Sequence, residues 1–381
     1  MPQRRTVLAS GASLVAATVA GCTGDPTTDA DESENAAVDP YTVTVEPNGS
    51  YTFESIPETY AAIPSVWLDI GMAFGIEPDA VASFDRAPLK YYDLLPDVSL
   101  DQDAVTLLAG DAEEGYDKEN FYTADVDVHL IDPQALKFYA NWSDDDIAEI
   151  EDAAGPFLGT TIRFQSDSLT GGEEPAYDLY GAFEKAAAIF QRQAQFEAWQ
   201  SFYDDFIEGI QQNLPPEDER PSVAAIWRGV NPDSGEFRIA EINAAANNTR
   251  TYRELGLRDD FEGRVPDGPI GYEELLDVDP DYIGAVGGLT SLTHEEFVST
   301  VVEPFENDTN GQKLSAVQNG NVVRTGGQYM GPIVDLYSTE ALAKQVFPDR
   351  FGEWPGAVSD VPEDERLFDR EELADLINGE F

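Results

Sequence analysis

The stretch of sequence that decides the expected fold is AYDLYGAFEKAAAIFQRQAQFEAWQSFYDDFIEGIQQNL, residues 176–214. It contains no proline, and its only residues that weaken a helix are Gly181 and Gly209. Apolar residues recur every three or four positions, which is the spacing of one face of an α-helix. They are Tyr180, Phe183, Ala187, Phe190, Ala194, Ala198, Phe202, Phe206 and Ile210. The pattern predicts one uninterrupted helix about 57 Å long at 1.5 Å per residue.

A helix of that length is longer than one small domain, so its apolar face needs packing partners in two domains. Short apolar stretches alternate with helical patterns on both sides of it, and this alternation is typical of α/β folds. We therefore expect two α/β lobes, residues 41–175 and 215–350, joined by one long rigid helix with a ligand cleft between the lobes. Two helices bent at Gly209, or a coiled-coil stalk, are the alternatives.

Local patterns place elements within each lobe. A hairpin is expected over 41–53, helices over 133–138, 144–154, 251–255 and 271–278, and strands in VDVHLID, TTIRF, SVAAIWRGV, YIGAVGG and NVVRTGG. Residues 351–381 are expected to form an acidic C-terminal extension that ends in a helix over 370–377.

The N-terminus has the layout of an export signal. Arg4 and Arg5 precede an uncharged, weakly apolar run, 6–21, which is too short for a membrane span of about 20 apolar residues. The paired arginines favour the twin-arginine route. The only cysteine, Cys22, follows the run and is the expected lipidation site; a free cysteine without a role is the alternative. Residues 1–21 are thus a predicted signal peptide, and 22–40 a disordered acidic tether on the outer face of the cell membrane.

The chain is strongly acidic, with a formal net charge of -52 from 22 Lys+Arg and 74 Asp+Glu. The acids are spread evenly, which suggests a protein from a very salty habitat, since molar salt shortens the Debye length to about 3 Å. Nucleic-acid binding is excluded because phosphate contacts need a basic face. Asn-x-Ser/Thr sequons, which could accept a glycan in an exported protein, start at Asn48, Asn141, Asn247 and Asn307.

Several stretches resemble one family in order along residues 51–354. They are IPSVWLDIGMAFGIEPDAV, YTADVDVHLIDPQAL, GYEELLDVDPDYIGAV, LSAVQNGNVVRTGGQYMGP and ALAKQVFPDRFGEW. They are similar to solute-binding lipoproteins of ABC importers for ferric siderophores, haem and cobalamin. The resemblance implies a monomer that captures a metal chelate, without a cofactor of its own, and delivers it to a permease and its ATPase.

The resemblance also implies one acidic docking residue in each lobe. Asp69 stands at the matching position of the first lobe, six residues before Gly75. The equivalent position in the second lobe is Arg250, which leaves that contact open; Glu241 or Asp259 could replace it. An ordinary solvated carboxylate is the alternative for Asp69.

Ligands of two-lobed α/β proteins bind at the carboxyl ends of strands. Arginine and aromatic residues that follow predicted strands are therefore the candidate ligand contacts, because guanidinium pairs with anionic oxygens and stacks on flat rings. They are Trp67, Arg86, Tyr92, Arg163, Trp227, Arg228, Arg250, Tyr252 and Tyr329. The alternative is that the aromatic residues belong to the core and the arginines to ion pairs.

Enzyme motifs are incomplete. HEEFV at His294 lacks the second histidine of a zinc protease, and no Gly-x-Ser-x-Gly or P-loop occurs. A calcium loop at Asp277 fails because Tyr282 occupies the required glycine position. The expected function is transport of a metal chelate, most simply a ferric siderophore. Cobalamin, haem or an oxyanion as cargo, and a cell-surface hydrolase that uses the same cleft, are the alternatives.

Overall fold

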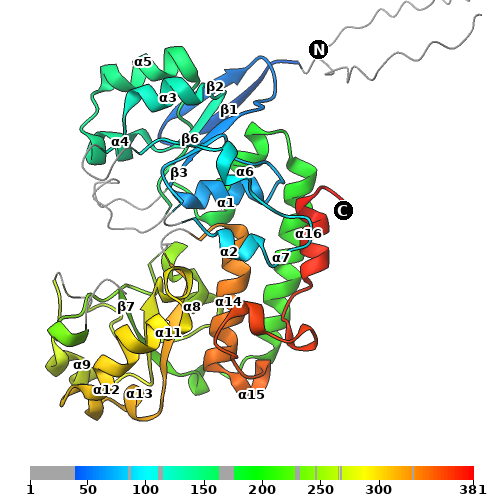
Figure 1. Ribbon diagram of the computed structural model, residues 1–381. Coiled ribbons are helices and arrows are strands. Elements are labelled where there is room, and N and C mark those ends of the chain that lie inside the picture. The colour runs from blue at the N-terminus through cyan, green and yellow to red at the C-terminus, as the bar shows by residue number, and fades with distance from the viewer. Residues whose placement is uncertain are drawn as a thin grey trace, which may run out of the picture. The chain divides into compact units, whose positions relative to one another are not determined.

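The computed structural model describes residues 39–84, 87–109, 115–162, 176–227, 232–244, 247–264, 266, 268–327 and 330–381. The calls on Arg4, Arg5 and Cys22 lie outside the described residues. Within 39–381 the chain forms two α/β lobes, each built on its own parallel sheet (Figure 1). The predicted fold class is confirmed.

The first lobe contains a parallel sheet in the order β5-β4-β3-β6. Its strands are β3 (Tyr60–Ile63), β4 (Ala80–Val81), β5 (Thr106–Leu107) and β6 (Val128–Ile131), and its helices are α1 (Ser65–Met72), α2 (Leu89–Tyr92), α3 (Lys118–Ala124), α4 (Pro133–Ala140) and α5 (Asp144–Ala154). The predicted hairpin is confirmed as β1 (Tyr41–Val45) paired with β2 (Gly49–Phe53). TTIRF is not a strand in its described part, 160–162.

The second lobe contains a parallel sheet in the order β10-β9-β7-β8. Its strands are β7 (Ser222–Trp227), β8 (Arg258–Asp259), β9 (Tyr282–Val286) and β10 (Val322–Thr325). Its helices are α8 (Arg250–Glu254), α9 (Tyr272–Val278), α10 (Gly288–Ser291), α11 (His294–Phe297), α12 (Glu303–Asn307) and α13 (Ser315–Gln318). Strands β3, β4, β6 and β10 are buried along their whole length, as expected for parallel sheets covered on both faces.

The single helix predicted over 176–214 is wrong: two helices form, α6 (Leu179–Ile189) and α7 (Gln193–Asn213). The break lies at Gln191, whose φ of 53° is left-handed. The Arg192 N–H donates to the Ala187 carbonyl at 2.8 Å, the bond that closes a helix in a Schellman motif. Glycine is the usual residue at this point, so the sequence carries no clear stop signal.

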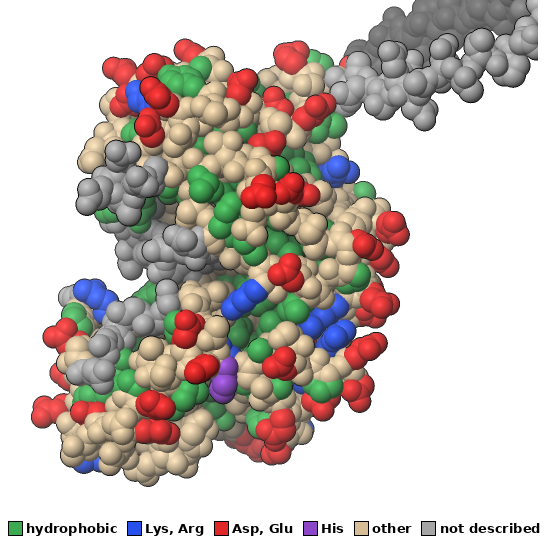
Figure 2. Space-filling view, in the orientation of Figure 1, with side chains coloured by type: hydrophobic (Ala, Val, Ile, Leu, Met, Phe, Trp, Pro, Cys, Tyr) green, Lys and Arg blue, Asp and Glu red, His purple; other side chains and the backbone are tan. Residues whose placement is uncertain are grey.

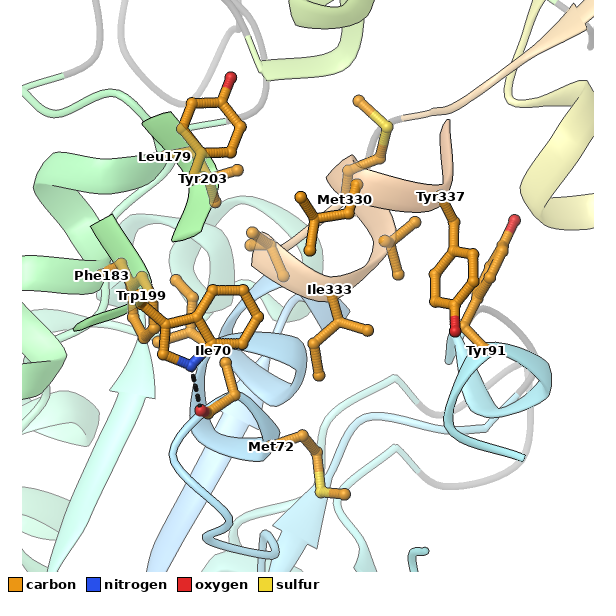
Figure 3. Packing of buried hydrophobic residues seen from close by; sticks show 14 of the residues in the cluster. Ile70, Met72, Tyr91, Leu179, Phe183, Trp199, Tyr203, Met330, Ile333 and Tyr337 are labelled. Carbon is orange, nitrogen blue, oxygen red and sulfur yellow. Dashed lines mark hydrogen bonds between the residues drawn. The ribbon is translucent and has the colours of Figure 1, made fainter. Parts of the chain in front are cut away.

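The break shifts the buried face of the second helix. In α7 the buried apolar residues are Phe196, Trp199, Tyr203, Phe206, Ile207 and Ile210. Ala194 of the predicted stripe is exposed, and Ala198 and Phe202 are only half-buried. Trp199 donates its indole N–H to the Ala73 carbonyl of the first lobe at 2.7 Å (Figure 3). Tyr203 accepts a hydrogen bond from Arg250 of the second lobe. Although shorter than predicted, α7 therefore contacts both lobes.

The C-terminal part of the chain returns to both lobes. Helix α14 (Pro332–Val346) is buried almost throughout and contacts α1 and α2 as well as β10 and α8. It is followed by α15 (Pro348–Phe351) and α16 (Arg370–Ile377). The predicted terminal helix is confirmed at both ends. Residues 351–381 pack closely on the core: Gln195 of α7 donates to the Leu376 carbonyl at 2.8 Å.

Candidate functional site

Each sheet has a point where the strand order reverses, and the carboxyl ends of the strands beside it are the expected ligand position. In the first lobe this point lies between β3 and β6, and in the second between β7 and β9. Figure 2 shows the surface hollowed between the upper and lower lobes at the left of the view. These strand ends define the candidate binding site.

At the switch point of the first lobe, Asp132 directly follows β6. Its carboxylate accepts the N–H of Gln134 at 2.9 Å, and both the N–H and the hydroxyl of Thr161 at 3.0 and 2.7 Å. It thereby caps α4 and holds the neighbouring segment 156–162 beside the sheet. The Asp132 carboxylate positions this part of the site, and it already accepts hydrogen bonds from Gln134 and Thr161.

At the switch point of the second lobe, Trp227 is the last residue of β7 and is half-buried. Beside it the ends of β9 and β10 come very close: a Cβ atom on Gly327 would lie 2.7 Å from the Cα of Gly287. Gly287 has a φ of 84°, which favours glycine. Glycine at these positions lets two strand ends approach each other at the edge of the site.

Contacts between the lobes form what we call the interlobe seam. The N–H of Asn247, in the second lobe, donates to the Ile162 carbonyl of the first at 3.3 Å. Asp69 on α1 accepts the N–H groups of Ile333 and Val334, in the first turn of α14, at 3.0 and 3.1 Å. The lobes are therefore joined by a backbone hydrogen bond and by the side chain of Asp69 as well as by α7.

Three predicted ligand contacts are core residues. Trp67 donates its indole N–H to the Thr160 carbonyl at 3.0 Å, Tyr92 its hydroxyl to Asp69 at 2.8 Å, and the Tyr252 hydroxyl bonds that of Thr325 at 2.8 Å. All three side chains are buried. Because they have no surface to offer a ligand, the predictions for Trp67, Tyr92 and Tyr252 are wrong, and the alternative that they pack in the core is right.

Arg250 belongs to an internal ion-pair cluster. Its guanidinium lies 3.3 Å from Asp335 and 3.2 Å from Glu254, and it donates to the Tyr203 hydroxyl at 2.8 Å. It also lies over the Tyr180 ring, 5.1 Å from the centroid. Burial raises the pKa of Asp335 to about 6, although the charge of Arg250 lowers it. With these partners, Arg250 ties α8 to α7 and α14 and is not available as a ligand contact.

The docking role predicted for Asp69 is wrong, because its side chain is 0% exposed and cannot reach another protein. Two of its three hydrogen bonds instead cap α14 from a different element, and the third comes from the Tyr92 hydroxyl of α2. Burial raises the pKa of Asp69 to about 7, against hydrogen bonds from Val334, Tyr92 and Ile333 that lower it.

The remaining candidates follow strand ends in sequence. Arg228 comes directly after β7, Arg163 after Ile162, Arg86 after β4, and Tyr329 after β10. These four residues lie outside the described residues, so the predictions for them stay predictions. Of the nine predicted contacts, Trp227 is the described one that lies at the expected edge of a sheet.

Other sequence motifs have structural roles. His129 is buried, stacks on Phe157 with ring centroids 4.5 Å apart, and bonds the Gly155 carbonyl; burial lowers its pKa to about 4. The sequon at Asn247 is buried, whereas Asn141 and Asn307 are exposed. Within the described ranges, no group of three His, Cys, Asp or Glu side chains is placed to hold a metal ion. No helix in the same ranges is long and apolar enough to span a membrane.

Sequence reasoning missed residues that shape the site. Lys90 on α2 donates to the Leu289 carbonyl of the second lobe at 2.6 Å. Asp132 could have been recognised from Asp-Pro directly after a strand, which is a helix-start signal. Lys90 has no such signal, because its partner is a backbone carbonyl nearly 200 residues away in the chain.

Solved structures with the same arrangement of two lobes are solute-binding proteins. A periplasmic solute binding protein from Mycobacterium smegmatis is 15% identical, with a TM-score of 0.58 over 81% of this chain and 97% of that one. The petrobactin-binding protein YclQ from Bacillus subtilis is 12% identical, with a TM-score of 0.54 over 89% and 99%. The siderophore binding protein BauB, solved with two molecules of acinetobactin and ferric iron, is 15% identical, with a TM-score of 0.52 over 89% and 99%. At these identities the likeness shows the fold.

The fold is thus that of two-lobed solute-binding proteins. The periplasmic binding protein model matches residues 142–329. Over these residues the chain is similar to the periplasmic binding protein family. This similarity favours a binding protein over the hydrolase alternative. A comparison with curated proteins found no matching sequence.

Proposed function

We propose that the cargo of this binding protein is an anionic metal chelate, and specifically a ferric siderophore. The observation that carries the proposal is the pair of parallel sheets whose switch points meet the interlobe seam. Two proteins with this fold are described as binding siderophores, BauB and YclQ. Cobalamin, haem and inorganic oxyanions are the competing cargoes.

The chemistry of the candidate contacts supports an anionic cargo with flat rings. Arg86, Arg163 and Arg228 each follow a strand or a strand-like segment, and Trp227 and Tyr329 supply aromatic faces. Guanidinium forms paired hydrogen bonds with the oxygens of carboxylates and phenolates and also stacks on rings. Three arginines in this position are notable in a chain with 74 acidic residues, because they provide the positive charge that most of the surface lacks.

Delivery of the cargo completes the proposed role. The protein is monomeric, meets an ABC permease and its ATPase, and is held at the outer face of the membrane through a lipid on Cys22 and the tether 22–40. The paired arginines Arg4 and Arg5 direct export of the folded chain. The acidic surface suits a habitat with molar salt, in which repulsion between carboxylates is screened.

Arg228 offers the sharpest test of the site. Arg228→Ala is expected to weaken binding of a ferric tricatecholate at least tenfold, because it removes the positive charge that directly follows Trp227 in the sequence. Tryptophan fluorescence titrations in molar salt measure the affinity. Arg264→Ala is the matched control, since the Arg264 guanidinium donates to the Asp260 carbonyl on the surface. Equal affinities for wild type and both variants would remove Arg228 from the binding site.

A further inference from the structure

Helix α2 contacts three other elements through three consecutive residues. Lys90 donates to the Leu289 carbonyl of α10 at 2.6 Å, and the Tyr91 hydroxyl reaches the same oxygen at 3.4 Å. Tyr91 also packs on Tyr337 of α14, with ring centroids 5.3 Å apart (Figure 3). Tyr92 donates to Asp69 of α1. This short helix of the first lobe is thus attached directly to α10 of the second.

The Leu289 carbonyl oxygen that α2 contacts accepts no hydrogen bond from within its own helix, α10. The carbonyls in the last turn of a helix have no N–H group to accept from within it. Beyond α10, the N–H of Thr293 donates to Glu296 at 2.8 Å and so does not close a turn onto Leu289. A cation at a helix C-terminus is also favoured by the helix dipole. Lys90 and Tyr91 therefore supply donors that α10 lacks.

The charge of Lys90 makes this contact less favourable. Burial lowers the pKa of Lys90 to about 8, Arg324 on β10 lowers it further, and Glu296 on α11 raises it. Within the described residues, neither Lys90 nor Arg324 forms an ion pair with a carboxylate. Arg324 instead donates to the Leu292 and Gly356 carbonyls. Among the residues that the structure describes, these two cations thus share one side of the interlobe seam without a paired anion.

We propose that α2 is a latch that holds the two lobes together, and that the charge on Lys90 sets how tightly it closes. The latch is closed when Lys90 and Tyr91 donate to the Leu289 carbonyl. It opens when these donors return to water and the lobes separate at this side of the seam. The latch acts in the protein without cargo, so this proposal does not depend on which ligand the protein binds.

The direction of the pH dependence follows from the two states of Lys90. In the open state the amine is in water, where a lysine pKa is about 10.4. In the closed state its pKa is about 8, so closing favours the neutral amine. The closed state therefore gains up to about tenfold in population for each pH unit between these two values. Tyr91 and Tyr337, which face Lys90 and each other, stay protonated in this range because burial raises the pKa of each.

Distances between spin labels test the latch directly. The full chain carries Cys22→Ser with labels at Asp145→Cys on α5 and Glu306→Cys on α12, both exposed and in different lobes. Distances are measured without cargo from pH 7 to pH 10 in molar salt. We expect the wild-type distribution to shift to shorter distances as the pH rises. Lys90→Met is expected to remove that shift, and Lys185→Met, on α6 beside Tyr177, to retain it.

A second variant removes both of the donors on α2. Lys90→Met with Tyr91→Phe is expected to give longer and broader distances at every pH, because no donor from α2 then reaches Leu289. Circular dichroism confirms that each variant is folded. A wild-type distribution that does not change with pH, or an equal shift in Lys90→Met, would overturn the proposal. Since no cargo is present, neither result bears on ferric siderophore binding.

Discussion

The buried carboxylate of Asp69 stabilises the fold through the hydrogen bonds that it accepts. It satisfies two N–H groups of α14 and the Tyr92 hydroxyl. Asp69→Ala would leave all three donors buried without an acceptor, and we expect a loss of about 3 kcal/mol in the free energy of unfolding. Asp69→Asn keeps a carbonyl oxygen in the same place and should lose far less. Urea denaturation at pH 8 measures both; equal losses would show that the hydrogen bonds contribute little.

The raised pKa of Asp69 predicts how stability depends on pH. The ordinary value is 3.8, and the folded-state value is about 7. Between these values the folded protein keeps the proton and the unfolded chain releases it, so the stability contributed by this group falls as the pH rises. Unfolding measured from pH 4 to pH 7 should show wild type losing stability relative to Asp69→Asn. A constant difference between the two would contradict the raised pKa.

Substitution of Arg250 distinguishes a structural role of this residue from a role in ligand binding. Arg250→Met would leave Asp335, which has no exposed surface, without its cation, and we expect a loss of about 3–5 kcal/mol. Affinity for cargo should stay within twofold in the folded fraction. Chemical denaturation and a binding titration measure the two effects. A variant that keeps its stability but binds the cargo more weakly would show that Arg250 is a ligand contact after all.

At the scale of elements, helix α7 contains a glycine, Gly209, whose replacement tests the contribution of helix propensity to stability, because nothing in the structure requires glycine there. A Cβ atom there would meet no other atom within 4 Å. Gly209→Ala should therefore stabilise the protein by about 0.5–1 kcal/mol, since alanine loses less backbone entropy in a helix. Thermal unfolding measures the change. Gly331→Ala is the contrast: its Cβ would lie 2.4 Å from the Cβ of Asp69, so destabilisation is expected.

The sequence predicted elements well where local signals exist. Asp144–Ala154 and Arg370–Ile377 match the expected helices because each has an N-cap residue and an apolar stripe. The break at Gln191 could not be predicted, because it uses glutamine where glycine is usual and depends on tertiary packing. An apolar period of three to four residues continues across the break, which is why two helices appeared as one.

At the scale of the whole molecule, the two lobes and their parallel sheets could be predicted from alternating strands and helices. The candidate site could be predicted only in outline. Trp67 follows β3 as expected, whereas Tyr252 lies on α8. Both are buried in the core, and burial depends on the whole fold, which local sequence patterns do not give. The predicted long helix is broken, yet α7 still contacts both lobes, so the break does not remove the binding-protein fold.

The central claim is that the protein binds an anionic ferric chelate between its lobes. A panel of ferric desferrioxamine, a ferric tricatecholate, haem, cobalamin and vanadate, tested by thermal shift in molar salt, measures it most directly. A ligand at 100 times its Kd adds about 2.7 kcal/mol of stability and should raise the Tm by several degrees. We predict such a rise for the ferric tricatecholate, which is the anionic siderophore complex of the panel, and none for its iron-free form. A rise with cobalamin, haem or vanadate alone, or with none of them, would contradict the claim.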